Sequence, residues 1–136
     1  TVLAEGDDQS DPIVDSARAV LDGHIVLSRN LAESAHFPAI DIEASISRLM
    51  NSIIHEQHRH KASAFRQLLN QYHQNQELIT MGIYQPGSNP EIDNAIAAYP
   101  KLMQFLQQSF DEAVPFSLSL QQLDSVLAQH ASIPNR

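Results

Sequence analysis

The sequence lacks cysteine and tryptophan, and it has only four glycines and eight basic residues among its 136 positions. The absence of cysteine excludes disulfide bonds and thiolate catalysis, and it fits a reducing compartment. Acidic residues number 16, so the formal net charge is −8, which disfavours binding to nucleic acid or anionic lipid through bulk charge. The apolar runs span five residues at most, as at 95–99, whereas a transmembrane helix needs about twenty.

Hydrophobic residues make up 43% of the chain, which is enough for a buried core at this length. In residues 1–50, two short segments at 1–5 and 24–28 are compatible with β-strands. Between them, Asp11-Pro12 marks the start of a helix and Gly23 marks its end. Because two strands cannot bury a sheet by themselves, we interpret this region as the last β-α-β piece of a larger α/β domain.

The remaining residues, 51–136, have the apolar spacing of helices. A long first helix is predicted to end at Gly82, and Asn89-Pro90 begins a second one. We expect Pro100 to kink or divide this second helix. A capping-box pattern at 119–122 predicts the start of a last helix. The chain is therefore predicted to be mainly α, with an antiparallel helical bundle as its C-terminal part.

Two short patterns resemble site motifs but lack the residues that the chemistry needs. HEQHRH at 55–60 places His55 and His58 on one helix face. A zinc-protease helix requires His-Glu-x-x-His, and Arg59 stands where its second histidine belongs. The turn at 82–89 has two glycines at phosphate-loop spacing, without the lysine and the metal-binding hydroxyl. We therefore expect no metal site, a solvated helix face at 55–60, and no tight phosphate binding by this chain alone.

Three segments resemble those of a known family, in order and spacing. Residues 21–50 have the sequence LDGHIVLSRNLAESAHFPAIDIEASISRLM. This segment resembles the end of the RecA-like nucleotide domain of rotary-type ATPases. Within that group, it is most similar to the flagellar protein-export ATPases and their type III secretion relatives. Two later segments support the resemblance, namely residues 77–96, ELITMGIYQPGSNPEIDNAI, and residues 105–110, FLQQSF. It implies that residues 1–50 end the RecA-like ATPase core and that 51–136 form a C-terminal helical domain. Since the chain does not begin with methionine and has no Walker motif, we expect a portion of a longer ATPase.

The resemblance implies a catalytic role for Arg48. In this family the arginine at the matching position is a finger that enters the nucleotide site of the neighbouring subunit. Phosphoryl transfer places charge on equatorial oxygens, and a planar guanidinium meets that charge with a fork of donors. The alternative from the sequence alone is an intramolecular salt bridge.

Two aromatic residues, Phe37 and Phe110, match the family positions that stack on adenine. Stacking on an aromatic face contributes about 1–3 kcal/mol per base in nucleic-acid binders, and it reads no hydrogen-bonding edge. The resemblance therefore predicts a cofactor-binding pair with weak selectivity for the base. The alternative is that both phenylalanines are ordinary core residues.

The predicted interhelical turn carries Tyr84, Pro86 and Gly87, at the place where rotary ATPases have the loop that meets the central stalk. Rotary motors often have an acidic run there, whereas this turn is nearly uncharged. The resemblance implies that Tyr84 and Pro86 make apolar contacts with a coiled-coil stalk protein. The alternative is a turn that only connects two helices.

Taken together, the resemblance implies an ATP hydrolase that energises flagellar protein export. It would be a homohexamer that binds ATP and magnesium at subunit interfaces, although this piece by itself is expected to bind neither and to be inactive. The expected partners are the stalk protein, a regulatory subunit and export chaperone–substrate complexes, in the cytoplasm at the inner-membrane export apparatus. The alternatives are an injectisome ATPase and a non-catalytic helical binding module.

Overall fold

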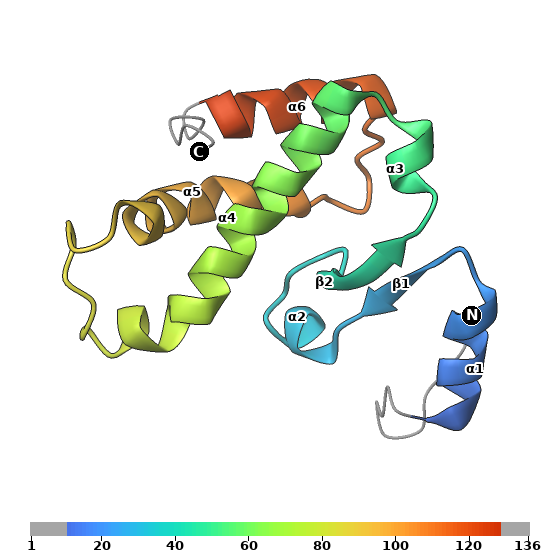
Figure 1. Cartoon of the computed structure of the whole chain (residues 1–136), viewed down its shortest axis with the longest axis horizontal. Coiled ribbons are helices and arrows are strands. Elements are labelled where there is room, and N and C mark those ends of the chain that lie inside the picture. Colours follow the sequence, from blue (N-terminus) through green and yellow to red (C-terminus); the bar gives the residue numbers. More distant parts are fainter. Residues whose placement is uncertain (1–10, 129–136) are drawn as a thin grey trace.

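The structure of the chain, a computed structural model, describes residues 11–128 (Figure 1). It is mainly helical, with one small sheet near its N-terminal end, so the predicted fold class is confirmed. The strand predicted at residues 1–5 lies outside the described residues. The elements in chain order are α1 (Pro12–Val20), β1 (Gly23–Leu27), α2 (Arg29–Glu33), β2 (Ile40–Ser47), α3 (Met50–Ile53), α4 (Glu56–Thr80), α5 (Pro90–Leu106) and α6 (Phe116–Ala128).

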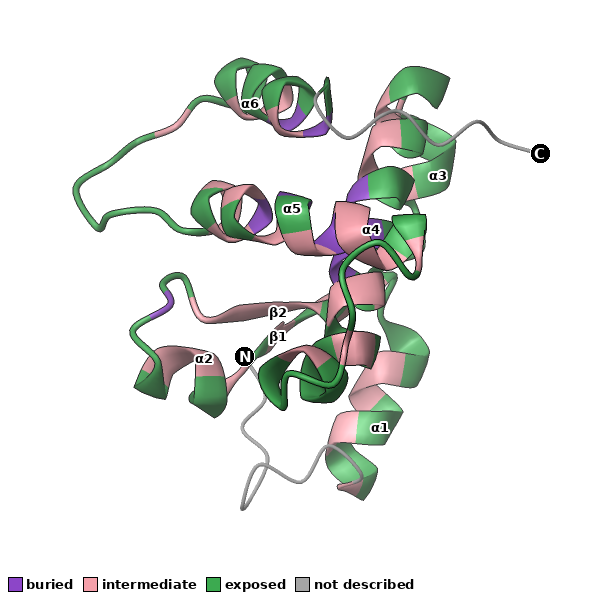
Figure 2. Cartoon of the chain, turned by 90° about the vertical axis from the view of Figure 1, so that its left-hand side faces the viewer, coloured by how far each residue is buried: buried purple, intermediate pink, exposed green. Residues whose placement is uncertain are grey.

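The core lies where α4, α5 and α6 meet, and Figure 2 shows most of the buried residues gathered there. Small alanines at Ala95 and Ala98 on α5 are completely buried, which lets neighbouring helices approach closely. Leu102 on the same helix is also completely buried. The cluster consists of Phe65, Leu68, Leu69, Ala98, Leu102, Leu123 and Leu127. The helical half of the chain therefore holds most of the apolar burial that stabilises the fold.

Helix α1 begins as the sequence predicts, but it ends before Gly23. The Asp11 carboxylate caps it by accepting the backbone N–H of Ile13 at 2.7 Å. Gly23 is instead the first residue of β1, where a Cβ atom would lie 2.6 Å from the carbonyl oxygen of Ile46. The glycine is thus required for close approach of two strands, and the prediction that it stops the helix was wrong.

The sheet consists of β1 and β2, which pair in antiparallel orientation. At one end Gly23 pairs with Ser47, and at the other Leu27 pairs with Ile40. Between these ends the register shifts, because β2 contributes more residues than β1. The sequence patterns predicted strands only at 1–5 and 24–28, and the bulged strand β2 was not foreseen.

The helical half confirms the predicted end of α4 and the predicted start of α5. Gly82 follows α4 with a φ of 68°, and Asn89 caps α5 by accepting the N–H of Glu91 at 2.9 Å. Pro100 lies inside α5 without dividing it. Buried side chains on both sides of Pro100 hold the helix together despite the missing N–H, which costs about 3 kcal/mol in an isolated helix.

Helix α6 begins at Phe116, three residues before the predicted capping box. The carbonyl of Pro115 accepts the backbone N–H groups of Leu118 and Ser119, at 2.9 and 3.1 Å. Ser119 is therefore already inside the helix, and the prediction that it caps the start was wrong. In the described part of the chain, none of the helices combines the length and apolar character needed to cross a bilayer.

Candidate functional site

Arg48 directly follows β2, and its backbone is held in place while its side chain is exposed. Its N–H donates to the carbonyl of Asp22 at 2.8 Å, just before β1 begins. The guanidinium donates to the carbonyl of Arg18, from Nη2 at 3.3 Å. Within residues 11–128, Arg48 forms no ion pair with a carboxylate. The intramolecular salt bridge considered from the sequence is therefore not what holds Arg48 in this part of the chain.

Phe37 and Phe110 lie against each other although 73 positions separate them in the sequence. Their ring centroids are 5.8 Å apart, with 40° between the ring planes. The backbone is joined nearby, because the N–H of Gln108 donates to the carbonyl of Phe37 at 2.9 Å. Phe37 is 38% exposed and Phe110 is 90% exposed, so neither is a core residue. The structure thus forms an accessible aromatic pair beside the C-terminal end of α5.

Arg48 and the aromatic pair lie at opposite ends of β2. Because Ile40 pairs with Leu27 and Ser47 pairs with Gly23, the ends of β2 are as far apart as those of β1. Gly23 and Leu27 are four residues apart, and each residue of a strand adds about 3.3 Å, so the two ends of β2 lie roughly 13 Å apart along the strand direction. The structure therefore does not bring Arg48 to the aromatic pair within one chain.

Asp93 stabilises the turn between α4 and α5 by hydrogen bonds within it. The sequence analysis did not single out this residue. The carboxylate of Asp93 accepts the N–H of Gly87 at 2.9 Å, and its other oxygen lies 2.9 Å from the Tyr84 hydroxyl. Gly87 has a φ of 89°, which favours glycine. The only sequence signal for this role was an acid in the first turn of α5, and that is equally typical of a helix-dipole contact.

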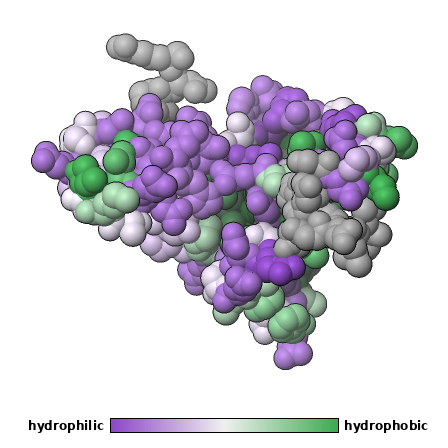
Figure 3. All heavy atoms as spheres, turned by 90° about the horizontal axis from the view of Figure 1, so that it is seen from below, coloured by the Kyte–Doolittle hydropathy of each residue, from purple (hydrophilic) through white to green (hydrophobic). Residues whose placement is uncertain are grey.

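The predicted turn residues differ in exposure. Pro86 and Gly87 are exposed, whereas Tyr84 is half-buried with its hydroxyl bonded inside the turn. The larger apolar surface here belongs to residues that flank the turn, namely Leu78, Met81 and Ile83, which are 44%, 69% and 62% exposed. Figure 3 shows hydrophobic atoms gathered at the left-hand end of the molecule, where Figure 1 places this turn.

The histidines of the 55–60 segment have neighbours other than a metal-ligand set. His60 lies 3.5 Å from Glu56 on the exposed face of α4, and the ring of His58 lies 6.1 Å from that of Phe116. Among the described residues there is no group of three or more histidines and acids placed to bind a metal ion.

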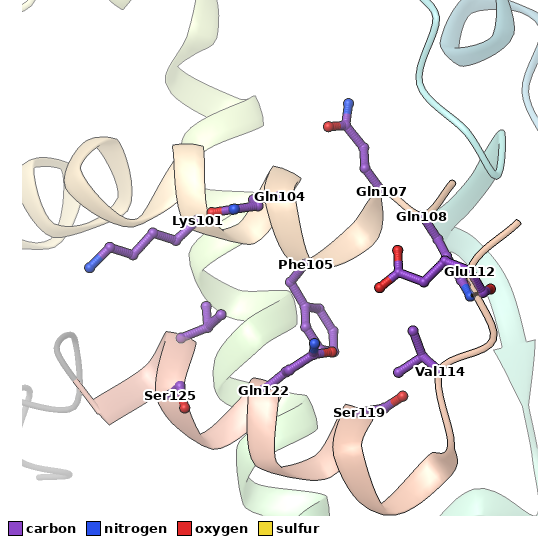
Figure 4. A pocket seen from close by; sticks show the side chains of 11 residues that line it. Lys101, Gln104, Phe105, Gln107, Gln108, Glu112, Val114, Ser119, Gln122 and Ser125 are labelled. Atoms are coloured by element: carbon purple, nitrogen blue, oxygen red, sulfur yellow. Dashed lines mark hydrogen bonds between the residues drawn. The ribbon is translucent and has the colours of Figure 1, made fainter. Parts of the chain in front are cut away.

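A groove of about 590 Å³ lies between α5, α6 and the segment that joins them (Figure 4). Its lining is largely neutral, with the amides of Gln104, Gln107 and Gln122 prominent in the close-up view. Lys101 and Glu112 are its only charged lining residues. The groove offers hydrogen-bonding amides but no nucleophile paired with a base, and it does not include the predicted site residues.

Two family models match the chain. Residues 54–125 match the T3SS EscN ATPase C-terminal domain, and residues 1–47 match the nucleotide-binding domain of the ATP synthase alpha/beta family. A flagellum-specific ATP synthase of Salmonella typhimurium is 56% identical over 126 residues, which is 93% of this chain and 28% of that protein. A type 3 secretion system ATPase of Sinorhizobium fredii is 50% identical over 116 residues, or 85% of this chain and 26% of that protein.

Solved structures agree with these matches. The assembled ATPase EscN of enteropathogenic E. coli superimposes with a TM-score of 0.89 at 41% identity, over 93% of this chain and 31% of EscN. EscN in complex with its central stalk EscO superimposes with a TM-score of 0.80 at 40% identity, over 85% of this chain and 29% of that one. The chain thus spans under a third of the length of these relatives. It belongs to the family of flagellar and type III secretion ATPases, as a C-terminal portion with the EscN-type helical domain.

Proposed function

We propose that the full-length protein is an ATP hydrolase that energises flagellar protein export and that this chain supplies part of its subunit interface. The identity to the flagellum-specific relative is 56%, against 50% for the Sinorhizobium type 3 secretion ATPase, which favours the flagellar system over an injectisome. The observation that carries the catalytic part is Arg48: an exposed guanidinium on an anchored backbone, without a carboxylate partner among residues 11–128.

Arg48 is proposed as the arginine finger that acts on the nucleotide of a neighbouring subunit. A guanidinium stabilises phosphoryl transfer best when its position is fixed before the reaction. The bond from the Arg48 N–H to Asp22, together with the tight approach of Gly23 to Ile46, fixes the backbone here. A finger that acts on the nucleotide of a neighbouring subunit requires a ring of subunits, such as a homohexamer.

The aromatic pair of Phe37 and Phe110 is proposed to stack on the adenine of ATP. Contact distances of about 3.5 Å on each face of a base require ring planes roughly 7 Å apart. The rings are now in direct contact at 5.8 Å, so the almost fully exposed Phe110 would swing outward to admit the base. The phosphates and magnesium would be held by segments of the full-length protein outside this chain, because the chain carries no phosphate-binding loop sequence.

The α4–α5 turn is proposed to contact a coiled-coil stalk protein through Tyr84, Pro86 and Gly87. EscN, a relative of similar fold, has been solved in complex with its central stalk EscO, which supports a partner of this kind. The regulatory subunit and the export chaperone–substrate complexes complete the proposed set of partners. The proposed location is the cytoplasmic side of the inner membrane, at the export apparatus.

The proposal is tested by Arg48→Ala in the full-length enzyme. We expect ATP binding and assembly to remain near wild type while turnover falls by about 10³–10⁵, the range known for arginine fingers. Mixed hexamers with subunits disabled in the phosphate-binding loop should recover partial activity, because some interfaces then pair an intact loop with an intact finger. Full turnover by Arg48→Ala, or no recovery in mixed hexamers that demonstrably form, would show that Arg48 is a structural arginine.

A further inference from the structure

Strand β2 bulges away from β1 in the segment that leads to Arg48. Val26 pairs with Asp41 and His24 pairs with Ile46, so a single β1 residue lies opposite the segment 42–45 of β2. Side chains replace the missing ladder bonds inside this bulge. The Ser45 hydroxyl accepts the N–H of Val26 at 3.0 Å, and the Asp41 carboxylate accepts the N–H of Ala44 at 2.9 Å. The bulge is therefore an ordered part of the strand that is stabilised by its own hydrogen bonds.

Helix α4 holds this bulge by three contacts. The Arg66 guanidinium donates from Nη2 to the carbonyls of Ile42 and Ser45, at 3.0 and 2.9 Å. It therefore bridges the two ends of the bulge by hydrogen bonds. His73 Nδ1 lies 2.7 Å from the carboxylate of Glu43, in the middle of the bulge. The side chain of Ile42 packs against the core of the helical half.

Arg66 and His73 are seven residues apart, which is about two turns, so they lie on one face of α4. Through these two side chains, the middle part of the long helix contacts β2. The C-terminal end of α4, at Thr80, leads into the turn that is proposed to contact the stalk. The part of α4 from Arg66 to Thr80, about 21 Å long, thus connects that turn to the strand that precedes Arg48.

We infer that Arg66 is the positioning residue through which α4 holds the proposed finger Arg48 at the subunit interface. The inference rests on the proposed function of Arg48. Ser45 accepts the hydrogen bond from Arg66 and precedes Arg48 by three residues. The chain between Ser45 and Arg48 packs closely against Gly23 of β1. A shift of α4 along or around its axis pulls on Ser45 and moves the guanidinium. Misplacement of a catalytic group by about 1 Å can lower the rate 10²-fold.

The test uses Arg66→Met in the full-length hexamer, because methionine keeps much of the aliphatic stem and removes the donors. Arg59→Met is the matched control: Arg59 is on the same helix and also donates to a backbone carbonyl, that of Asn51 at 3.1 Å, but it lies outside the bulge. We expect Arg66→Met to lower kcat by about tenfold to a hundredfold with KM within about twofold, and Arg59→Met to leave both within about twofold. Arg66→Lys should restore part of kcat, because an ammonium can still donate to both carbonyls.

Mixing experiments separate positioning of the finger from a general role in stability. Arg66→Met subunits mixed with loop-disabled subunits should turn over faster than either homohexamer, since the finger side of some interfaces is then intact. Arg66→Met mixed with Arg48→Ala should show no gain, because both changes affect the same side of every interface. Assembly and thermal unfolding, measured for each variant, identify any loss that comes from misfolding.

The outcomes distinguish this inference from the function on which it rests. Wild-type turnover by Arg48→Ala refutes the finger and with it the inference. A collapse with Arg48→Ala, together with equal kcat for Arg66→Met and Arg59→Met, refutes only the role of Arg66. A loss in Arg66→Met that loop-disabled subunits do not rescue also refutes it, because the damage then lies in the variant's own nucleotide site or fold.

Discussion

At the scale of single residues, the candidate site combines an anchored backbone with exposed side chains. Arg48 and Phe110 present their functional groups to solvent, while neighbouring N–H and carbonyl groups fix the chain next to them. This division suits residues that act on a ligand or on another subunit, because the position is set before binding while the side chain stays accessible. Fully buried residues such as Leu102 have the opposite arrangement and serve packing.

Arg48→Lys in the full-length enzyme tests whether the planar guanidinium itself is needed. Lysine keeps the positive charge, but its ammonium cannot reproduce the fork of parallel donors that Arg48 offers. We expect the variant to recover less than about a tenth of wild-type kcat, while ATP affinity remains unchanged. Steady-state kinetics and equilibrium nucleotide binding measure the two quantities, and near-complete recovery would mean that only the charge matters.

At the scale of elements, α4 is the central piece, because it contributes to the core, grips the bulge of β2 and leads into the turn. It is joined to α5 by a close stack of Tyr72 on Tyr99, with ring centroids 3.5 Å apart and 11° between the planes. Burial raises the pKa of the Tyr99 hydroxyl above its usual value of 10.0, and the neighbouring Tyr72 adds to the rise.

The raised pKa of Tyr99 predicts a loss of stability at alkaline pH. The folded state holds this proton more tightly than the unfolded state, so the contribution is fully present below pH 10 and is lost as pH rises above it. The slope for one proton cannot exceed about 1.4 kcal/mol per pH unit. Urea unfolding followed by circular dichroism between pH 9 and 11 should show a shallower loss for Tyr99→Phe, whereas equal slopes would contradict the assignment.

The α4–α5 turn supports a prediction about the stalk partner. Substituting Tyr84 and Pro86 together by alanine in the full-length enzyme should weaken stalk binding by about tenfold or more, and basal ATP hydrolysis should stay within about twofold. The physical reason is that the turn loses an apolar ring and a rigid residue, while the proposed finger Arg48 and the aromatic pair lie outside the turn. Binding assays against Ser125→Ala, a change on α6, provide the control, and unchanged affinity would remove the turn from the interface.

At the scale of the whole molecule, the chain consists of a helical half with a real core and a smaller half whose apolar side chains are exposed. Ile25 and Leu27 of β1 are 72% and 70% exposed, in contrast to the buried residues of α4 and α5. A two-stranded sheet is marginal by itself. This asymmetry fits a chain that covers 28% of its flagellar relative, with the rest of the nucleotide domain contributed by other segments.

The isolated chain should therefore fold in its helical half but bind no nucleotide. Calorimetry at millimolar Mg-ATP should give no saturable heat, because stacking on the aromatic pair alone offers only about 1–3 kcal/mol per base, whereas a millimolar Kd requires about 4 kcal/mol. Circular dichroism should show strong helix bands. Saturable heat at these concentrations would mean that the chain carries a nucleotide site of its own.

The sequence by itself determined the features that depend on contacts a few residues apart. Asp11 and Asn89 cap the helices that follow them, and Gly82 ends α4, since each of these effects is a local hydrogen bond or a local backbone preference. The mainly helical class followed from the same periodicity. The family resemblance selected Arg48, Phe37 and Phe110, whose roles stay predictions.

Only the tertiary structure decided how distant segments meet. It brought Phe110 to Phe37, placed Asp93 inside the turn and set Arg66 on the bulge of β2. It also kept α5 continuous through Pro100, because burial on both sides outweighs the lost hydrogen bond. Such contacts join residues that no local pattern relates, and their free energy arises from burial and from donors meeting acceptors across elements, which become defined only when the chain is packed.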